Sequence, residues 1–125
     1  MAGEILNLGC AALRDAIIKR ELTSIAATEA VYAAIDKLNP KVGAYLTLCR
    51  DTALAQAAET DKKIASGKAV GPLAGIPVAI KDNICTNFGT TSCGSKILQN
   101  FHAPYNATVT EKLLSAGAVI VGKTN

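Results

Sequence analysis

The sequence predicts an α/β fold, on the evidence of two short apolar runs separated by a helical segment. Ile76–Ile80 and Ala118–Val121 are rich in β-branched residues and are bounded by turn formers, as expected of strands buried on both faces. Residues 108–116 carry apolar side chains at helical spacing, with Asn106 or Thr108 as the expected cap. A strand, a helix and a returning strand form a right-handed crossover, so the two runs are predicted to be parallel neighbours.

The first 69 residues are predicted to be mainly helical. Apolar positions recur at helical spacing in two segments: Leu6, Cys10, Leu13 and Ile17 in the first, and Thr28, Val31, Tyr32 and Ile35 in the second. The second helix should begin at the cap Thr23–Ser24 and stop at Asn39–Pro40. Residues 44–48 are a candidate strand, and an Ala-rich helix is expected over 54–64.

Composition indicates part of a larger domain. Half of the 125 residues are hydrophobic and only 18% are charged, so much of the surface is expected to be covered by other protein. We expect residues 1–125 to be the N-terminal portion of one domain: a helical lead-in over 1–69, and a strand-loop-helix-strand unit over 70–125. The net charge of +3 and the absence of Lys/Arg runs longer than two residues exclude a strong nucleic-acid footprint.

Metal, disulfide and membrane chemistry have little support. Four dispersed cysteines, Cys10, Cys49, Cys85 and Cys93, show no zinc spacing, and they are predicted to be reduced, partly buried thiols. His102 is the only histidine, which leaves nothing for a histidine triad. No apolar run approaches a membrane-spanning length.

Lys81 is the candidate catalytic residue. It follows the first apolar run at its carboxyl end, where open α/β sheets place their ligand crevices. Spacing alone favours a lysine that is simply the first residue exposed to solvent. The alternative is an amine screened from water and used as a base, because desolvation favours the neutral form of lysine.

The surrounding sequence supports the second alternative. Residues 71–83 are Gly-Pro-Leu-Ala-Gly-Ile-Pro-Val-Ala-Ile-Lys-Asp-Asn, and this segment closely resembles the lysine segment of the amidase signature family. Three later phrases agree in order and spacing: Thr-Thr-Ser-Cys-Gly-Ser at 90–95, Pro-Tyr-Asn-Ala-Thr-Val at 104–109, and Ala-Gly-Ala-Val-Ile-Val-Gly-Lys-Thr-Asn at 116–125. The resemblance covers the whole chain and is most specific from Gly71 onward. Within the family, the chain is similar to the A subunits of bacterial and organellar glutamyl-tRNA(Gln) amidotransferases.

The resemblance implies an amidase-signature fold, a mixed sheet covered by helices, of which this chain is the N-terminal part. It also implies a catalytic set of a serine nucleophile, a second serine on a cis peptide bond, and a lysine, here Lys81. Both serines belong to a Gly/Ser-rich signature expected after Asn125. By itself the chain is therefore expected to be inactive.

For the intact protein, the resemblance implies glutamine hydrolysis through a covalent acyl-enzyme. The ammonia would pass to a B subunit that uses ATP and Mg²⁺ to convert Glu-tRNA(Gln) into Gln-tRNA(Gln), with a small C subunit holding the two larger ones together. No cofactor or metal is expected in this chain, and the location is expected to be cytoplasmic, or organellar in a eukaryote. Two alternatives stay open: a general amidase acting on free amides, and a segment that only docks.

Other polar residues near Lys81 have simpler interpretations. Ser92 and Ser95 lie in a loop without a Gly-x-Ser-x-Gly elbow, so turn and capping roles are favoured over a nucleophile. Asp82–Asn83 are interpreted first as turn residues and second as groups that orient Lys81 or line its site. The loop 90–95 is equally consistent with an active-site wall and a solvated loop.

One motif matches a phosphate-binding loop in letters only. Residues 117–124 fit Gly, any four residues, then Gly-Lys-Thr. A phosphate loop must follow a strand and open a helix, whereas here the four intervening residues are themselves the expected strand. Gly117 is expected to end the preceding helix, and Lys123 to end a second parallel strand close to Lys81.

Overall fold

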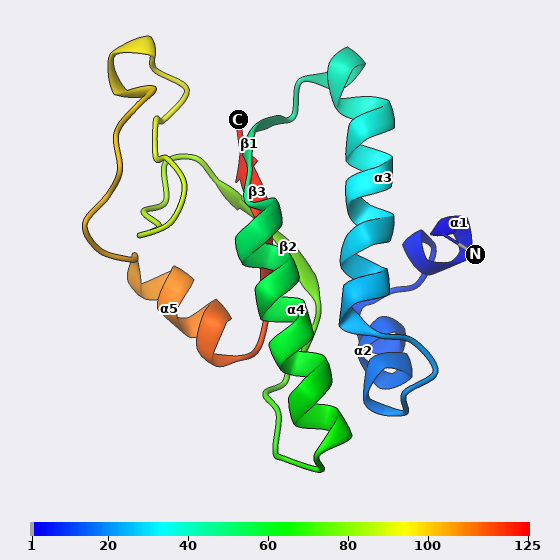
Figure 1. The fold of residues 1–125 in the computed structure, drawn as a ribbon. Coiled ribbons are helices and arrows are strands. Elements are labelled where there is room, and N and C mark those ends of the chain that lie inside the picture. Colours follow the sequence, from blue (N-terminus) through cyan, green and yellow to red (C-terminus); the bar gives the residue numbers. More distant parts are fainter. Residues whose placement is uncertain (1) are drawn as a thin grey trace.

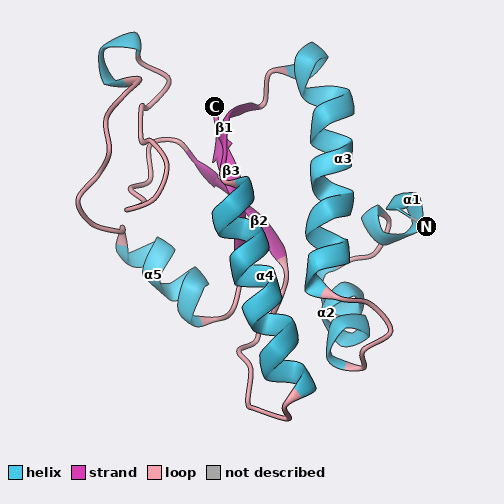
Figure 2. Ribbon diagram, viewed as in Figure 1, coloured by secondary structure: helices cyan, strands magenta, loops and turns pink. Residues whose placement is uncertain are grey.

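A computed structural model of the chain describes residues 2–125 and shows three strands surrounded by helices (Figures 1 and 2). In chain order the elements are α1 (Ala2–Leu6), α2 (Cys10–Ile18), α3 (Ser24–Val42), β1 (Tyr45–Leu48), α4 (Arg50–Ala65), β2 (Pro77–Lys81), the short 3₁₀ helix η1 (Lys96–Leu98), α5 (Thr108–Ser115) and β3 (Val119–Thr124). No helix in this described part of the chain is long and apolar enough to cross a membrane.

The sheet is mixed, with the strand order β1-β3-β2. β3 pairs with β2 in parallel and with β1 in antiparallel orientation. The connection from β2 to β3 contains α5, so the predicted parallel crossover is confirmed. The strand and helix expected over 44–48 and 54–64 are confirmed as β1 and α4, with slightly different ends.

Helices cover both faces of the sheet. On one face, Tyr32 and Ile35 of α3 and small alanines of α4 pack against Val119 and Val121. On the other face, Ile80 and Ile120 pack against Leu113 and Leu114 of α5 and against the loop that follows β2. The alternation of side chains along β3 thus places a core on each side of the central strand. In Figure 1, α3 and α4 lie together beside the sheet, with α5 apart from them.

An irregularity in the β2–β3 pairing determines which side chains share a face. Val78 pairs with Ile120, but the next residue, Ala79, pairs with Gly122, so β3 has one extra residue at this point. Such a bulge changes the face on which the following side chains lie. As a result Lys123 pairs with Ile80 and not with Lys81.

Two helical predictions for the lead-in were wrong in detail. Leu6, Cys10, Leu13 and Ile17 do not lie on one helix: α1 ends at Leu6 and α2 starts at Cys10, after Gly9 adopts an extended backbone as the N-cap. Only Leu13 and Ile17 of this set are buried, whereas Cys10 is exposed. The separation of the two helices explains why the spacing misled, since a face of one helix requires one continuous axis.

The predicted stop of α3 at Asn39–Pro40 was also wrong. The helix begins as predicted at the Thr23 cap, whose side chain accepts a hydrogen bond from the Ala26 N–H, but it continues to Val42. Gly43 ends it with φ of 64°, a conformation that glycine adopts without steric cost. Because Pro40 lies in the last turn, its missing N–H removes one bond and does not stop the helix.

The cap predicted for α5 differs as well. Its N-cap is Ala107, and no side chain caps the helix. The Asn106 side chain instead accepts from the Asn87 N–H and donates to Glu111, so it ties the preceding loop to the helix.

Candidate functional site

Lys81 is the last residue of β2, and its side chain is exposed. Its carbonyl accepts a hydrogen bond from the Ile84 N–H at 3.0 Å, which turns the chain back immediately after the strand. A pocket of about 270 Å³ opens at this end of the sheet and is lined by Lys81, Asp82, Asn83, Cys93, Gly94, Thr124 and Asn125. The predicted site residue therefore lies in a hollow at the carboxyl edge of the parallel strands, as open α/β sheets place ligand crevices.

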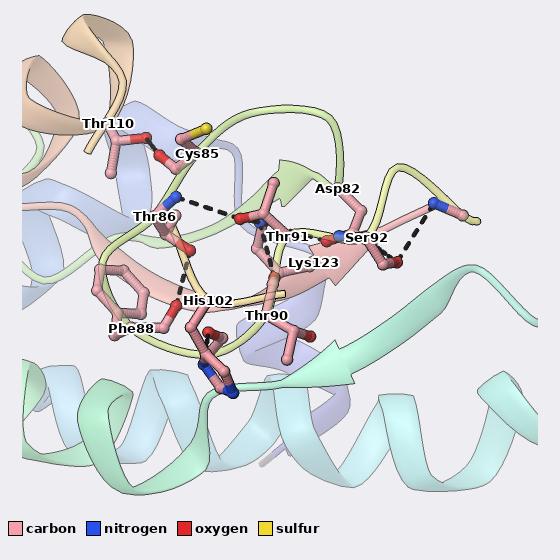
Figure 3. A network of polar contacts seen from close by, with 12 residues as sticks. Asp82, Cys85, Thr86, Phe88, Thr90, Thr91, Ser92, His102, Thr110 and Lys123 are labelled. Atoms are coloured by element: carbon pink, nitrogen blue, oxygen red, sulfur yellow. Dashed lines mark hydrogen bonds and ion pairs between the residues drawn. The ribbon is translucent and has the colours of Figure 1, made fainter. Parts of the chain in front are cut away.

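Asp82, the next residue, points away from solvent into a polar cluster (Figure 3). The Ser92 hydroxyl and the Ser92 N–H both donate to carboxylate oxygen Oδ2, the latter at 3.1 Å. The other oxygen, Oδ1, lies 3.3 Å from Lys123 Nζ. Asp82 is 1% exposed and Lys123 is completely buried, so this is an ion pair inside the protein.

The Lys123 ammonium has two further partners in the cluster. It donates to the Thr90 carbonyl and to the Thr91 hydroxyl, each at 3.1 Å. A buried lysine charge is tolerated when it is paired and hydrogen-bonded, and these contacts meet both conditions.

The electrostatics of Asp82 follow from these contacts. Burial by itself would raise the pKa of its carboxyl group. The hydrogen bonds from Ser92, together with the positive charge of Lys123, outweigh burial and hold the pKa below its usual range. The carboxylate is thus stabilised as an anion at neutral pH.

This cluster attaches the loop over 82–103 to β3, and a second set of hydrogen bonds closes the loop on itself and ties it to α5. Cys93 N–H donates to the Asp82 carbonyl, and Thr91 N–H donates to the Phe101 carbonyl, both at 3.0 Å. Thr110 of α5 donates to the Cys85 carbonyl at 3.0 Å, also visible in Figure 3. Thr91 and Ser92 are buried, so the wall interpretation of loop 90–95 fits better than a solvated loop.

Neither candidate serine lies in the Lys81 pocket. Ser92 and Ser95 line a neighbouring hollow of about 230 Å³, together with Thr47, Thr90 and Lys96 of its lining. The Ser92 hydroxyl is already committed to the Asp82 carboxylate, and Ser95 precedes η1 as its N-cap. Ser92 thus has a structural role, as the sequence favoured, whereas the Ser95 side chain makes no capping hydrogen bond at its N-cap position.

The phosphate-loop pattern has a structural explanation at each glycine. Gly117 has a φ of 90° just after α5, where a Cβ would lie 3.0 Å from the Ala74 Cα atom. At Gly122, in the centre of the sheet, a Cβ would lie 2.6 Å from the Thr47 carbonyl oxygen of β1. The strand expected within this pattern is present as β3, and the Lys123 amine is enclosed by protein partners. The geometry supplies no phosphate-binding loop here.

Sequence reasoning missed the pairing of Asp82 with Lys123. It treated the first as a turn residue and the second as a neighbour of Lys81. The register shift between Val78 and Ala79 could not be derived from the apolar pattern, because the pattern is the same with or without one extra residue. A lysine that directly continues a fully apolar strand was the one signal available, since it must either leave the core or find a buried anion.

Comparison with known proteins identifies the family. Residues 26–125 match the Amidase family. The chain belongs to the amidase signature family. The family resemblance predicted from the sequence is therefore confirmed. The α/β fold class is confirmed as well, because the mixed sheet and its helices superpose on solved amidases.

This member of the family is similar both to amidotransferase A subunits and to solved amidases. It is 48% identical over 122 residues to the A subunit of glutamyl-tRNA(Gln) amidotransferase from Desulforamulus reducens, covering 98% of this chain and 25% of that protein. Native peptide amidase from Stenotrophomonas maltophilia superposes with a TM-score of 0.86 at 40% identity, covering 95% of this chain and 25% of that one. For fatty acid amide hydrolase the TM-score is 0.89 at 28% identity, with coverages of 99% and 22%. The chain spans about a quarter of the length of the curated relatives that it matches.

Proposed function

We propose that this chain carries the catalytic lysine of an amidase subunit that hydrolyses glutamine and supplies ammonia for the conversion of Glu-tRNA(Gln) to Gln-tRNA(Gln). The observation that carries the proposal is the place of Lys81: an exposed amine at the carboxyl end of β2, lining a pocket within the segment of highest resemblance to the family. The 48–53% identity to amidotransferase A subunits, compared with 40% to the peptide amidase, favours the amidotransferase over a general amidase.

The chemistry assigned to Lys81 is proton transfer. An amide carbon is attacked by a hydroxyl only when a base removes the hydroxyl proton. In the proposed mechanism the neutral Lys81 amine takes that proton from the nucleophilic serine through the bridging serine, and returns it to the leaving ammonia. The acyl-enzyme is then hydrolysed by water. Both serines would come from the complete protein, so the 125-residue chain alone is expected to release no ammonia.

The proposed partners act on the product. A B subunit would use ATP and Mg²⁺ to activate Glu-tRNA(Gln) and accept the ammonia, and a C subunit would hold the two larger ones together. Hydrolysis itself needs no cofactor from this chain in the proposed mechanism. A cytoplasmic or organellar location follows from the same proposal.

A chimera tests the proposal directly. Residues 1–125 replace the matching quarter of the Desulforamulus reducens protein, and ammonia release from glutamine is measured together with Gln-tRNA formation in the presence of that organism's B and C subunits. Lys81→Ala is expected to lower kcat by about 10⁴-fold or more, as removal of one member of a catalytic set does. Lys81→Arg should fail similarly, because a guanidinium stays protonated.

The control is Lys112→Ala, which removes an exposed lysine of α5. It should leave kcat unchanged. Near-normal turnover by Lys81→Arg would show that the lysine acts only as a positive charge. Hydrolysis of a peptide amide without hydrolysis of glutamine would instead identify a general amidase.

A further inference from the structure

The buried cluster of Asp82, Ser92 and Lys123 has no role in the proton transfer described above, although Asp82 directly follows Lys81 in the chain. We propose that Asp82, Lys123 and Ser92 form a positioning device for Lys81. They fix the backbone from which the lysine side chain extends, and they keep the neighbouring carboxylate occupied so that it does not pair with the amine. The inference rests on the proposed role of Lys81 as the base.

Several hydrogen bonds and one ion pair converge on Asp82. Asp82 N–H donates to the Thr124 carbonyl at 2.7 Å, and its carbonyl accepts from Cys93 at 3.0 Å. Its carboxylate accepts twice from Ser92 and pairs with Lys123. Both backbone groups and one carboxylate oxygen of Asp82 are therefore hydrogen-bonded, and the other oxygen, Oδ1, has the Lys123 ion pair as its contact. The Lys81 side chain itself is exposed.

The side chains of Lys81 and Asp82 lie on opposite faces of the sheet. Asp82 lies two residues beyond Ile80, and Lys123 pairs with Ile80 across the ladder, so the acid and its partner lie on the same face. Alternation places the Lys81 side chain on the opposite face. Without the bulge after Val78, Lys123 would pair with Lys81 and two cationic side chains would share a face. The bulge thus brings the second lysine to Asp82.

Burying the Asp82–Lys123 pair has a desolvation cost. Replacing such a buried ion pair by apolar side chains of similar size is often neutral or stabilising for a fold. Ile80 and Ile120 on the same sheet show that apolar packing is available there. A costly pair immediately after the candidate base is better explained by the control of local geometry and charge than by stability.

The charges near Lys81 are few enough to assign. Asp82 and Cys93 are the other ionisable residues lining its pocket, Lys123 lies behind Asp82, and Lys96 lines the neighbouring hollow. An unpaired carboxylate next to an amine favours the protonated amine, whereas an unpaired ammonium favours the neutral amine. Breaking the pair from its two ends should therefore affect Lys81 in opposite directions.

The test uses the chimera with Asp82→Asn, Lys123→Met, the double variant, and Ser92→Ala. We expect each single variant to lower kcat for glutamine by about 10- to 100-fold with KM nearly unchanged, as misplacement of a catalytic group does. The acid limb of the pH profile, where kcat/KM falls because Lys81 becomes protonated, should move to higher pH in Lys123→Met and to lower pH in Asp82→Asn. In the double variant the limb should return to its original position, while the reduced kcat persists.

Two measurements keep the outcomes distinct. Thermal unfolding reports whether each variant is folded, and the double variant removes both charges at nearly constant side-chain volume, so it remains informative if a single variant does not fold. NMR of ¹³C-methylated lysines, with Lys81 assigned through Lys81→Arg, gives the titration midpoint of its amine independently of turnover.

Variants that lose stability but retain kcat, the acid limb and the Lys81 titration midpoint would overturn the inference and leave a purely structural ion pair. An active Lys81→Ala chimera would overturn the proposed function instead. In that case opposite shifts of the Lys81 midpoint would still support the electrostatic part of the inference, and unchanged midpoints would reject it.

Discussion

The carboxyl ends of β2 and β3 lie side by side, and each carries a lysine with an opposite fate. Lys81 ends β2 with its side chain in an open pocket. Lys123, the penultimate residue of β3, is completely enclosed and paired with Asp82. Two lysines at neighbouring positions of one sheet thus have different environments: Lys81 is accessible, and Lys123 is part of the core.

The role of a lysine at a strand end depends on the face of the sheet on which its side chain lies. On one face Asp82, Thr90 and Thr91 supply an anion and two acceptors, so an ammonium can be buried. Lys81, by contrast, is exposed at the end of β2 and lines a pocket to which Asp82 also contributes. A sequence motif that ends in lysine, such as the pattern at 117–124, therefore indicates little until the face is known.

The largest expected contrast is in stability. Lys123→Ala leaves the Asp82 carboxylate buried without its cation, and the loss of one partner of a buried pair costs about 3–5 kcal/mol. Lys81→Ala removes an exposed side chain and should change the free energy of unfolding by no more than about 0.5 kcal/mol. Urea unfolding of the 125-residue chain and of both variants measures the two values.

Equal losses in the two variants would contradict the burial difference on which the comparison depends. Asp82→Asn combined with Lys123→Ala is the informative control, because it removes the buried charge. It should recover part of the stability lost in Lys123→Ala alone.

The second contrast is between Gly122, in the central strand β3, and Gly3, in the N-terminal helix α1. Gly122→Ala should destabilise the chain by about 1–3 kcal/mol, because the new methyl group would overlap the Thr47 carbonyl oxygen and the close-packed Tyr45 ring. Gly3→Ala in α1 is the matched control, since no atom lies within 4 Å of a Cβ built there. Unfolding of both variants in urea checks the prediction, and a neutral Gly122→Ala would mean that β1 is not held against β3 as described.

The unit from β2 to β3 was predictable from the sequence because local signals there agree with tertiary structure. Ala118–Val121 is buried as predicted, and the helical segment between the two apolar runs forms the crossover. The prediction that Ile76–Ile80 is buried on both faces was wrong, because β2 is an edge strand of the sheet and Ala79 is exposed. The lead-in was predicted less well. Gly9 separates α1 from α2 and Pro40 lies inside α3, and both depend on backbone geometry that apolar spacing does not specify.

The candidate site was predictable in part. Lys81 was found from the segment around it, and its place at the strand end follows from the apolar run that precedes it. The Asp82–Lys123 pair was not, because it joins residues 41 positions apart through a register shift. Pairing of this kind is a property of the assembled sheet and has no local sequence signal.

The third contrast uses one cysteine near each lysine as a probe. Cys93 is exposed and lines the Lys81 pocket. Cys49 is buried, and its N–H donates to the Val121 carbonyl of β3 at 3.0 Å. Burial raises the pKa of the Cys49 thiol, although the charge of Lys123 opposes part of that rise. Burial and a raised thiol pKa therefore both slow reaction at Cys49.

With a water-soluble thiol reagent near neutral pH, Cys93 should be modified at least about 100-fold faster than Cys49, which corresponds to an opening free energy of about 2.8 kcal/mol at the buried site. Peptide mass spectrometry at successive times separates the two sites, exposed Cys10 serves as the internal reference for fast reaction, and urea should equalise all of them. Equal rates at Cys49 and Cys93 in the folded chain would show that the end of β3 is as open as the end of β2, and the contrast between the two lysines would then be lost.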